Sequence, residues 1–296
     1  MPAATRYFLP HLLHPALPPT PTLDLHNLGK PWKKTKLTHT QFTPQLEFRI
    51  CPAFARKPHT VGIQLDSSFD KSRQWGPGSD LYCPDERMRI AQLNGTHDFA
   101  FNMFCADRPQ FLLLTLDSYR RQNELLDRAD FEAALVMMKS EAAEDMYVIF
   151  NGGEEAGCSR VHKHLQGLKG PPPGFECFVE EGKRRVVPFK YFSYRFKEGF
   201  GSVTGEEMVN VYEGLISKAK EALGLPQSSV GCPHGLFLWK DWMVVIPRRK
   251  SGIEGTKASA ATGGIVGSVW LVDESPMEDW LRLGCRNVLA QLGVEP

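Results

Sequence analysis

The sequence has almost no excess of either charge. Its 296 residues carry 35 Lys and Arg against 34 Asp and Glu, so the net charge is +1. A protein that binds nucleic acid or a membrane surface usually carries a strong basic excess, and we therefore expect neither kind of partner. No apolar run reaches the roughly 18–20 residues that a membrane-spanning helix needs. Aromatic residues make up 10% of the chain and charged residues 23%, a composition too apolar for a disordered protein.

Several common motifs are also missing. No two of the seven cysteines form a CxxC pair, so a zinc ribbon is not expected. An odd, scattered set of cysteines in a long chain indicates reduced thiols, and we predict a cytoplasmic location, with the nucleus as an alternative ahead of the mitochondrion. The chain contains no GxGxxG and no Walker loop, so the two commonest nucleotide-binding motifs are absent.

The first 44 residues differ from the rest of the chain. No acidic residue precedes Asp24, six prolines interrupt the first 23 residues, and residues 30–36 are basic. A secretory signal needs an unbroken apolar stretch and a transit peptide needs an Arg-rich amphipathic helix, and this segment has neither pattern. We predict an irregular Pro-rich and basic arm over residues 1–44. One domain, long enough to bury a large core, is predicted over residues 45–296.

Hydrophobic periodicity predicts strands and helices in mixed order. Strands are predicted over residues 99–104, 111–115, 146–150, 161–168, 175–179 and 186–196, with a hairpin over 236–246. Helices are predicted over residues 117–126, 128–143, 204–223 and 275–292. The last two helices each begin at a capping box, formed by Thr204 with Glu207 and by Ser275 with Glu278. Strands interspersed with hairpins and helices indicate an α+β fold, an antiparallel sheet flanked by helices.

Chemistry-bearing residues concentrate between Gly157 and Gln166. His162, His164 and Gln166 occupy every second position, and side chains alternate along a strand, so all three are expected on one face. Lys163 is expected on the other face. The loop over residues 151–160 contains three glycines, and backbone N–H groups in such a loop can bind phosphate oxygens.

This arrangement suits three kinds of site, and spacing alone leaves all three open. An imidazole nitrogen can attack the α-phosphorus of a nucleotide and hold it covalently, while neighbouring donors stabilise the developing charge. A His-x-His pair on a strand can instead supply two ligands to zinc or copper, with a third ligand from elsewhere. The same side chains can also form a buried polar cluster, although each unpaired group would cost about 1–3 kcal/mol.

The order of motifs along the chain resembles that of one known family. The core reads His-Lys-His-Leu-Gln from His162 to Gln166, after a glycine-bearing loop. Further similar segments, in the same order as in the family, cover residues 53–58, 96–104, 111–122, 187–192, 242–248 and 264–268. Over residues 45–290 the chain resembles the fungal diadenosine tetraphosphate phosphorylases, also called ATP adenylyltransferases, of the histidine-triad superfamily.

The resemblance implies a fold, a reaction and a set of site residues. The reaction is the reversible phosphorolysis of diadenosine tetraphosphate to ATP and ADP, with inorganic phosphate as the acceptor and a covalent nucleotidyl-histidine as the intermediate. His164 would be the nucleophile, flanked by His162 and Gln166. Substrate binding would fall to Lys57, Asn102, Asn151, Gly157, Cys158, Ser159 and Arg160. A divalent cation (Mg or Mn) would accompany the polyphosphate, with no metal held by the protein itself and no organic cofactor.

Two departures from the family pattern keep other functions in view. Met103 and Asp273 stand where the family has Lys. Each lost charge-assisted contact to a polyphosphate would weaken binding by about 1–3 kcal/mol. A non-catalytic nucleotide-binding paralogue is therefore the alternative to the enzyme, and a His-x-His metalloprotein is a second alternative. Cys158 is a further candidate nucleophile, but its small, Ala-like position favours a packing role.

Overall fold

The structure is a computed structural model of the chain. It describes residues 34–37, 46–57, 59–60, 75–83, 85–106, 109–140, 145–172, 174–179 and 187–296. The arm predicted over residues 1–44 lies outside the described residues, except for strand β1 (Lys34–Leu37).

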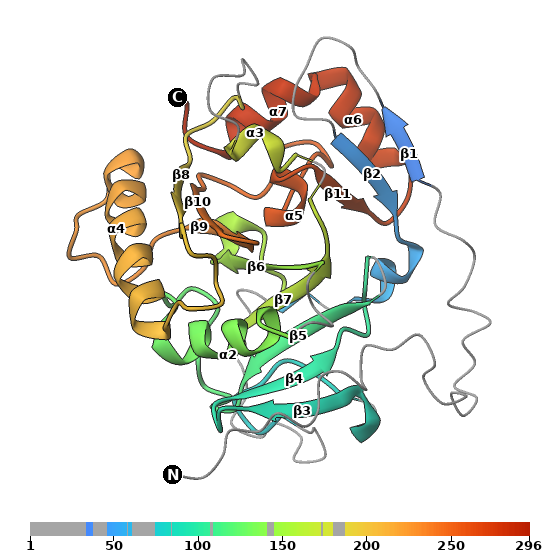
Figure 1. Cartoon of the computed structure of the whole chain (residues 1–296). Coiled ribbons are helices and arrows are strands. Elements are labelled where there is room, and N and C mark those ends of the chain that lie inside the picture. Colours follow the sequence, from blue (N-terminus) through green and yellow to red (C-terminus); the bar gives the residue numbers. More distant parts are fainter. Residues whose placement is uncertain are drawn as a thin grey trace, which may run out of the picture.

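A sheet of eight strands forms the centre of the molecule (Figure 1). The order of its strands is β3-β4-β5-β7-β6-β9-β10-β8, and every neighbouring pair is antiparallel. They are β3 (Arg89–Leu93), β4 (His97–Phe101), β5 (Gln110–Thr115), β6 (Met146–Gly152), β7 (His164–Lys169), β8 (Phe192–Arg195), β9 (His234–Trp239) and β10 (Trp242–Pro247). A smaller sheet places β2 (Leu46–Ile50) between β1 and β11 (Ser268–Leu271), with β2 and β11 parallel.

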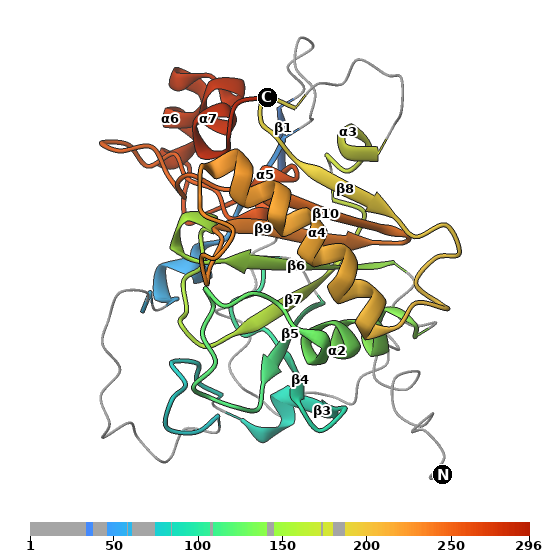
Figure 2. The same cartoon turned by 90° about the vertical axis from the view of Figure 1, so that its left-hand side faces the viewer.

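The helices lie on both faces of the large sheet. They are α2 (Arg128–Met138), α3 (Glu176–Val179), α4 (Gly205–Leu223), α5 (Thr262–Ile265), α6 (Ser275–Leu283) and α7 (Cys285–Leu292), with the 3-10 helices η2 (Pro52–Arg56), η3 (Glu86–Met88) and η5 (Glu154–Ala156). Figure 2 shows α4 and α2 lying across one face. Because strand side chains alternate, Phe150 joins the apolar cluster under α2 and α4, whereas Ile149 joins the cluster under α5, α6, α7 and the small sheet.

The expected α+β fold, an antiparallel sheet flanked by helices, is confirmed. The hairpin of β9 and β10 and the capping box of Thr204 with Glu207 are also confirmed. The sequence placed other boundaries differently. Strand β4 begins two residues earlier than predicted and ends at Phe101, strand β8 covers only the end of the range predicted from residue 186, and α2 ends at Met138. Residue 186 itself lies outside the described residues.

Three predicted elements are wrong. Residues 117–126 are not helical, because the chain there bonds to the segment before β7, with Gln122 N donating to Val161 O at 2.8 Å. Residues 176–179 form helix α3 where a strand was predicted, since the backbone after the proline-rich turn bonds to itself, Cys177 N to Gly174 O at 3.0 Å. The last helix is two helices, because Gly284 adopts φ +81 between α6 and α7, and the predicted cap at Ser275 is absent.

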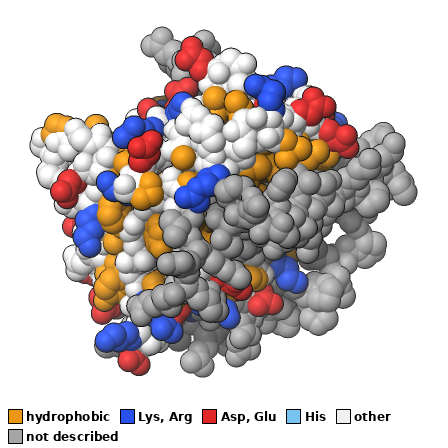
Figure 3. Space-filling model, turned by 90° about the horizontal axis from the view of Figure 1, so that it is seen from above, with side chains coloured by type: hydrophobic (Ala, Val, Ile, Leu, Met, Phe, Trp, Pro, Cys, Tyr) orange, Lys and Arg blue, Asp and Glu red, His pale blue; other side chains and the backbone are white. Residues whose placement is uncertain are grey.

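The surface of the described residues carries mixed charge. In Figure 3, Lys and Arg side chains are interspersed with Asp and Glu across the described part of the face seen from above. Among the helices of the described residues, none has the length and apolar character required to cross a membrane.

Candidate active site

A cavity of about 280 Å3 opens where β7 meets the glycine-bearing loop, on the face of the sheet that carries α5 and the small sheet. Residues from four parts of the chain line it. They are Phe54, Lys57 and His59; Asn151, Glu154, Gly157, Cys158 and Ser159; His164 and Gln166; and Ser251, Ser259, Ala260, Ala261, Gly264, Ser268 and Trp270. The cavity therefore joins the sequence-predicted loop and strand to a wall from the C-terminal third of the chain, which the sequence analysis did not place at the site.

His164 presents one ring nitrogen to this cavity. Its Nδ1 lies 2.8 Å from the carbonyl oxygen of His162, and because a carbonyl only accepts, Nδ1 carries the proton and donates. Burial, and to a smaller extent the nearby charges of Lys57 and Arg160, lower the pKa of His164 to about 4, against the opposing effects of the His162 carbonyl and Asp80. At neutral pH the ring is thus uncharged, with the lone pair on Nε2.

His162 does not share this orientation. Its Nε2 donates to the carbonyl oxygen of Thr115 at 2.9 Å, and its Nδ1 accepts from Ser79 Oγ at 2.7 Å. The side chain is fully buried, and burial lowers its pKa to about 4. His162 precedes the start of β7 and meets Arg121 only in an isolated bridge. The prediction that His162, His164 and Gln166 share one strand face therefore holds only for the last two.

Two side chains hold the backbone around His164 in place. The carboxylate of Asp80 accepts from Val161 N at 2.9 Å and from His162 N at 3.0 Å. Burial raises the pKa of Asp80, but these bonds and one from Thr60 bring it below its ordinary value. Gln122 binds His164 on both sides, accepting from its N–H at 2.8 Å and donating to its carbonyl at 3.0 Å.

The amide of Asn151 also has a fixed orientation. Thr262 N donates to Asn151 Oδ1 at 2.9 Å, which leaves the Nδ2 group of this cavity-lining residue as a donor. Gly157 has φ +82, and a Cβ there would lie 2.8 Å from Ala261 Cα, so only glycine fits this contact. The loop uses its own N–H groups, with Gly157 N donating to Glu154 O and Cys158 N to Gly153 O. These two N–H groups, which were expected to bind phosphate oxygens, thus already donate within the loop.

Lys57 supplies a positive charge to the cavity. Burial and the charge of Arg160 lower the pKa of Lys57 to about 8. Its Nζ lies 5.4 Å from the ring centroid of Phe54, and that ring packs edge-on against Trp270. The amine therefore sits on an aromatic wall and is protonated at neutral pH.

Cys158 lines the cavity but is a poor nucleophile. Burial raises the pKa of its thiol to about 12, and Glu154 and Glu155 add to the rise. A thiol reacts as the thiolate, so Cys158 is inert at neutral pH. The packing role favoured by the sequence agrees with this environment.

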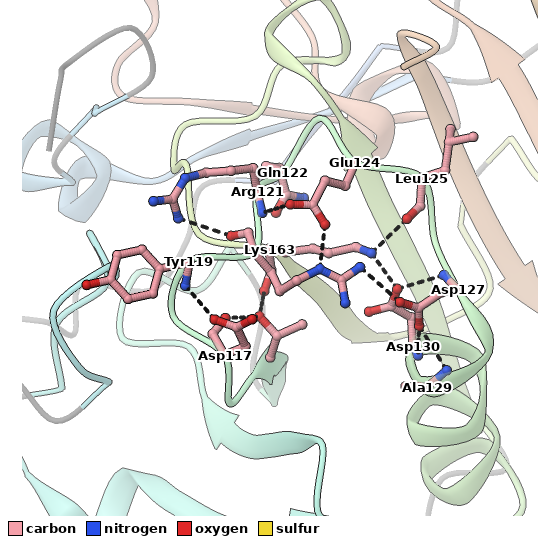
Figure 4. Close-up of polar contacts among 12 residues, drawn as sticks. Asp117, Tyr119, Arg121, Gln122, Glu124, Leu125, Asp127, Ala129, Asp130 and Lys163 are labelled. Carbon is pink, nitrogen blue, oxygen red and sulfur yellow. Dashed lines mark hydrogen bonds and ion pairs between the residues drawn. The ribbon is translucent and has the colours of Figure 1, made fainter. Parts of the chain in front are cut away.

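A buried ion pair lies at Lys163, the residue before β7, on the side of the sheet opposite the cavity (Figure 4). Lys163 Nζ donates to Asp130 Oδ2 at 2.6 Å and to the carbonyl of Leu125 at 2.7 Å. His97 Nε2 bonds to the other oxygen of Asp130 at 3.0 Å. Burial raises the pKa of Asp130, but the bonds from His97 and Lys163 outweigh it and bring the value to about 2. Lys163 lies between the two histidines and thus anchors the start of β7 to α2, on the face predicted for it.

Several predicted residues lie outside the cavity lining. Asn102 follows β4 and uses its Oδ1 to accept from Phe104 N at 3.0 Å. Arg160 is buried, and its charge reaches the cavity through its effect on Lys57. Met103 is exposed, and Asp273 accepts from Ser275 N at the start of α6. Neither of these two departures from the family pattern forms part of the cavity lining.

The geometry does not favour a His-x-His metal site. Both ring nitrogens of His162 are engaged by Thr115 and Ser79, and one nitrogen of His164 is engaged by a carbonyl. In the part of the chain that the structure describes, no three His, Cys, Asp or Glu side chains gather in a way that could hold a metal ion.

Sequence reasoning missed the residues that support the site. Asp80 and Ser79 come from a loop without periodicity, and Gln110 stands at the first position of β5, one residue before the predicted strand. Gln122 belonged to a segment predicted as a helix. A polar residue at the start of an otherwise apolar strand, such as Gln110, was the one visible signal.

Two family models show that the fold and the cavity belong to a nucleotidyltransferase of the phosphorylase type. The Ap4A phosphorylase N-terminal domain matches residues 48–173, and the ATP adenylyltransferase C-terminal domain matches residues 185–295. Together they cover most of the chain, which therefore belongs to the Ap4A phosphorylase family. The strands of the large sheet come from both matched regions.

Known proteins with similar sequences or structures agree. Protein APA1 of Saccharomyces cerevisiae is 24% identical in an alignment that covers 63% of this chain and 66% of the yeast protein. Diadenosine 5',5'''-P1,P4-tetraphosphate phosphorylase 2 of the same yeast is 25% identical in an alignment that covers 73% of each chain. The crystal structure of yeast Ap4A phosphorylase Apa2 matches with a TM-score of 0.67 at 20% identity, covering 89% of this chain and 90% of Apa2. At that identity the structural match establishes the fold.

Proposed function

We propose that this enzyme phosphorolyses dinucleoside polyphosphates, converting diadenosine tetraphosphate and inorganic phosphate reversibly to ATP and ADP through a nucleotidyl-His164 intermediate. The observation that carries the proposal is the neutral His164, whose Nδ1–H is held by the His162 carbonyl at 2.8 Å while the ring lines the cavity. The relative Apa2, solved in complex with AMP and with Ap4A, supports a dinucleotide substrate.

Two displacements account for the reaction. The lone pair of His164 Nε2 attacks the α-phosphorus, and the P–O bond to the β-phosphate breaks, so ATP leaves with the bonding electrons. As the ring gains positive charge, the proton on Nδ1 stays hydrogen bonded to the His162 carbonyl. An oxygen of inorganic phosphate then attacks the same phosphorus, the N–P bond breaks, and ADP is formed. This sequence predicts ping-pong kinetics and retention of configuration at phosphorus.

The remaining cavity residues stabilise charge on the phosphates. The amide nitrogens of Gln166 and Asn151 and the Ser159 hydroxyl are donors for non-bridging oxygens, and Lys57 offsets the charge of the polyphosphate. His162 acts by positioning, since its ring bonds to Thr115 and Ser79 while its carbonyl orients His164. A divalent cation, Mg or Mn, would travel on the polyphosphate and neutralise it further.

The cysteines support the expected compartment. All seven lie among the described residues, and none of them forms a disulfide, as in a reducing environment. The proposal therefore retains the cytoplasm as the location of the enzyme.

Single-turnover labelling tests the proposal. The protein is mixed with diadenosine tetraphosphate labelled at the α-phosphorus, without phosphate, quenched in base and weighed by intact mass spectrometry. The expected result is an acid-labile adduct one AMP heavier than the protein, which added phosphate discharges as ADP. Binding of the dinucleotide without any adduct would contradict the covalent route and indicate a non-catalytic nucleotide-binding protein.

The pH profile of the reaction should follow Lys57 and His164. The free enzyme needs His164 neutral and Lys57 protonated, so kcat/KM should fall below pH about 4 and above pH about 8. Replacing Lys57 with Arg keeps the charge at high pH, because guanidinium does not titrate there. The Lys57→Arg variant should therefore lose the alkaline limb and keep the acid limb. An alkaline limb unchanged in this variant would show that another group controls it.

A further inference from the structure

Two buried glutamine side chains on neighbouring strands form a short hydrogen-bonded chain that ends at the cavity. Gln110 opens β5 and Gln166 lies on β7, where the register pairs Leu112 with Gln166. Gln110 is 2% exposed and Gln166 is 7% exposed. Ala106 N donates to Gln110 Oε1 at 2.7 Å, and Gln110 Nε2 donates to Gln166 Oε1 at 2.8 Å.

The direction of these two hydrogen bonds is set by the N–H group of Ala106. A backbone N–H can only donate, so the Gln110 oxygen must face Ala106 and its NH2 group must face Gln166. The Gln166 oxygen must then face Gln110, and the Gln166 NH2 group is left on the cavity side. Within the described part of the chain, no group accepts a hydrogen bond from that nitrogen.

We propose that Gln110 is a positioning residue that fixes the amide of Gln166 with its nitrogen toward the transferred phosphoryl group. This inference rests on the proposed function, in which Gln166 donates to a non-bridging α-phosphate oxygen. Gln110 itself does not line the cavity. A free amide can turn by 180° and present its oxygen instead. An oxygen facing an anionic phosphate repels it, and losing one such donor typically lowers kcat by about 10²–10³-fold.

Two substitutions of similar size separate the possible orientations of Gln166. In Gln110→Glu the ionised carboxylate only accepts, so Gln166 must turn its NH2 group toward Glu and its oxygen toward the phosphate. In Gln110→Met the side chain imposes neither orientation. We expect the rate constant of adduct formation to fall about 100-fold in Gln110→Glu and about 10-fold in Gln110→Met, with the KM for diadenosine tetraphosphate changed less than about threefold.

The pH dependence of Gln110→Glu gives a readout that a purely structural role would not produce. A protonated Glu carries an O–H that donates to Gln166 Oε1 and restores the native polarity. Burial disfavours the ionised form, and lowering the pH increases the protonated fraction. Activity of Gln110→Glu relative to the native enzyme should therefore rise as the pH falls, whereas the ratio for Gln110→Met should stay flat.

A double-variant cycle shows whether Gln110 acts through Gln166. In a Gln166→Met background, Gln110→Glu should lower the rate constant of adduct formation by less than about threefold, because the amide that it would turn is absent. Gln291→Glu, the same charge change at an exposed position on α7, is the matched control and should leave the rate and its pH profile unchanged. Thermal melting verifies that each variant is folded.

The outcomes distinguish this inference from the proposed function. If the native enzyme forms no adduct, the proposed function fails. If the native enzyme forms the adduct and Gln110→Met forms it equally fast, Gln110 does not position Gln166, and the covalent route still stands. The inference would likewise be overturned if Gln110→Glu lowered the rate constant of adduct formation equally in the native and the Gln166→Met backgrounds. Should Gln110→Glu fail to fold, Gln110→Met alone and in the Gln166→Met background carries the test.

Discussion

Replacing His164 with asparagine should lower kcat by at least about 10⁴-fold, because the variant has no nitrogen lone pair with which to attack the phosphorus. The cavity should keep its binding groups, since Gln166, Asn151 and Lys57 are held by other contacts or by other elements. Dissociation constants for diadenosine tetraphosphate, measured by calorimetry, should therefore change less than about tenfold. The two measurements together separate a lost nucleophile from a lost cavity.

Cys158→Ala is the control for this experiment, because the thiol of Cys158 also lines the cavity and is the further candidate nucleophile that the sequence indicates. Its thiol, with a pKa raised by burial to about 12, should be dispensable, and the variant should keep kcat within about tenfold of the native value. Adduct formation that survives in His164→Asn and disappears in Cys158→Ala would transfer the nucleophilic role to the cysteine.

The part of the site that could be predicted from sequence follows from periodicity. Alternation along the predicted strand 161–168 places Lys163 opposite His164 and Gln166, and the structure has this arrangement although β7 begins only at His164. The glycine at position 157 could also be understood from its loop. His162 departs from the pattern, because its ring lies before β7 and bonds to Thr115 and Ser79.

The support of the site could not be predicted, because it depends on contacts between distant segments. Asp80 lies more than 80 residues before His162, and its own loop carries no periodic signal, yet its carboxylate bonds to the Val161 and His162 N–H groups. Such a bond exists only after the fold has brought the two segments together. Gln122 was predicted on a helix, and it binds His164 because that helix does not form.

Arg248 is a further residue whose contacts with distant segments could not be predicted from the sequence. It ends residues 242–248, one of the segments in which the sequence resembles the family. In the structure its side chain is buried and donates to carbonyl oxygens, among them Ala260 at 2.6 Å and Ala156 at 3.5 Å. It therefore ties the glycine-bearing loop to the C-terminal wall of the cavity, a role that no local pattern indicates.

The second large effect is expected on stability, in the variant Lys163→Met. Removing Lys163 leaves the Asp130 carboxylate buried without its cation, and breaking a buried ion pair in this way costs about 3–5 kcal/mol. Domains are commonly stable by only about 5–15 kcal/mol, so the midpoint of urea unfolding should fall markedly. Because Lys163 lies between His162 and His164, the folded fraction of the variant should also show slower adduct formation.

The same helix offers a matched control. Arg128 pairs with Glu132 at 2.7 Å on α2, but its side chain is 67% exposed, and an exposed pair contributes about 0–1 kcal/mol. Arg128→Met should therefore unfold close to the native protein. The double variant Lys163→Met with Asp130→Asn removes both charges, so its loss of stability should be smaller than the sum of the two single losses. Additive losses would mean that Lys163 and Asp130 stabilise the fold independently, and that the strand of the nucleophile does not depend on their ion pair.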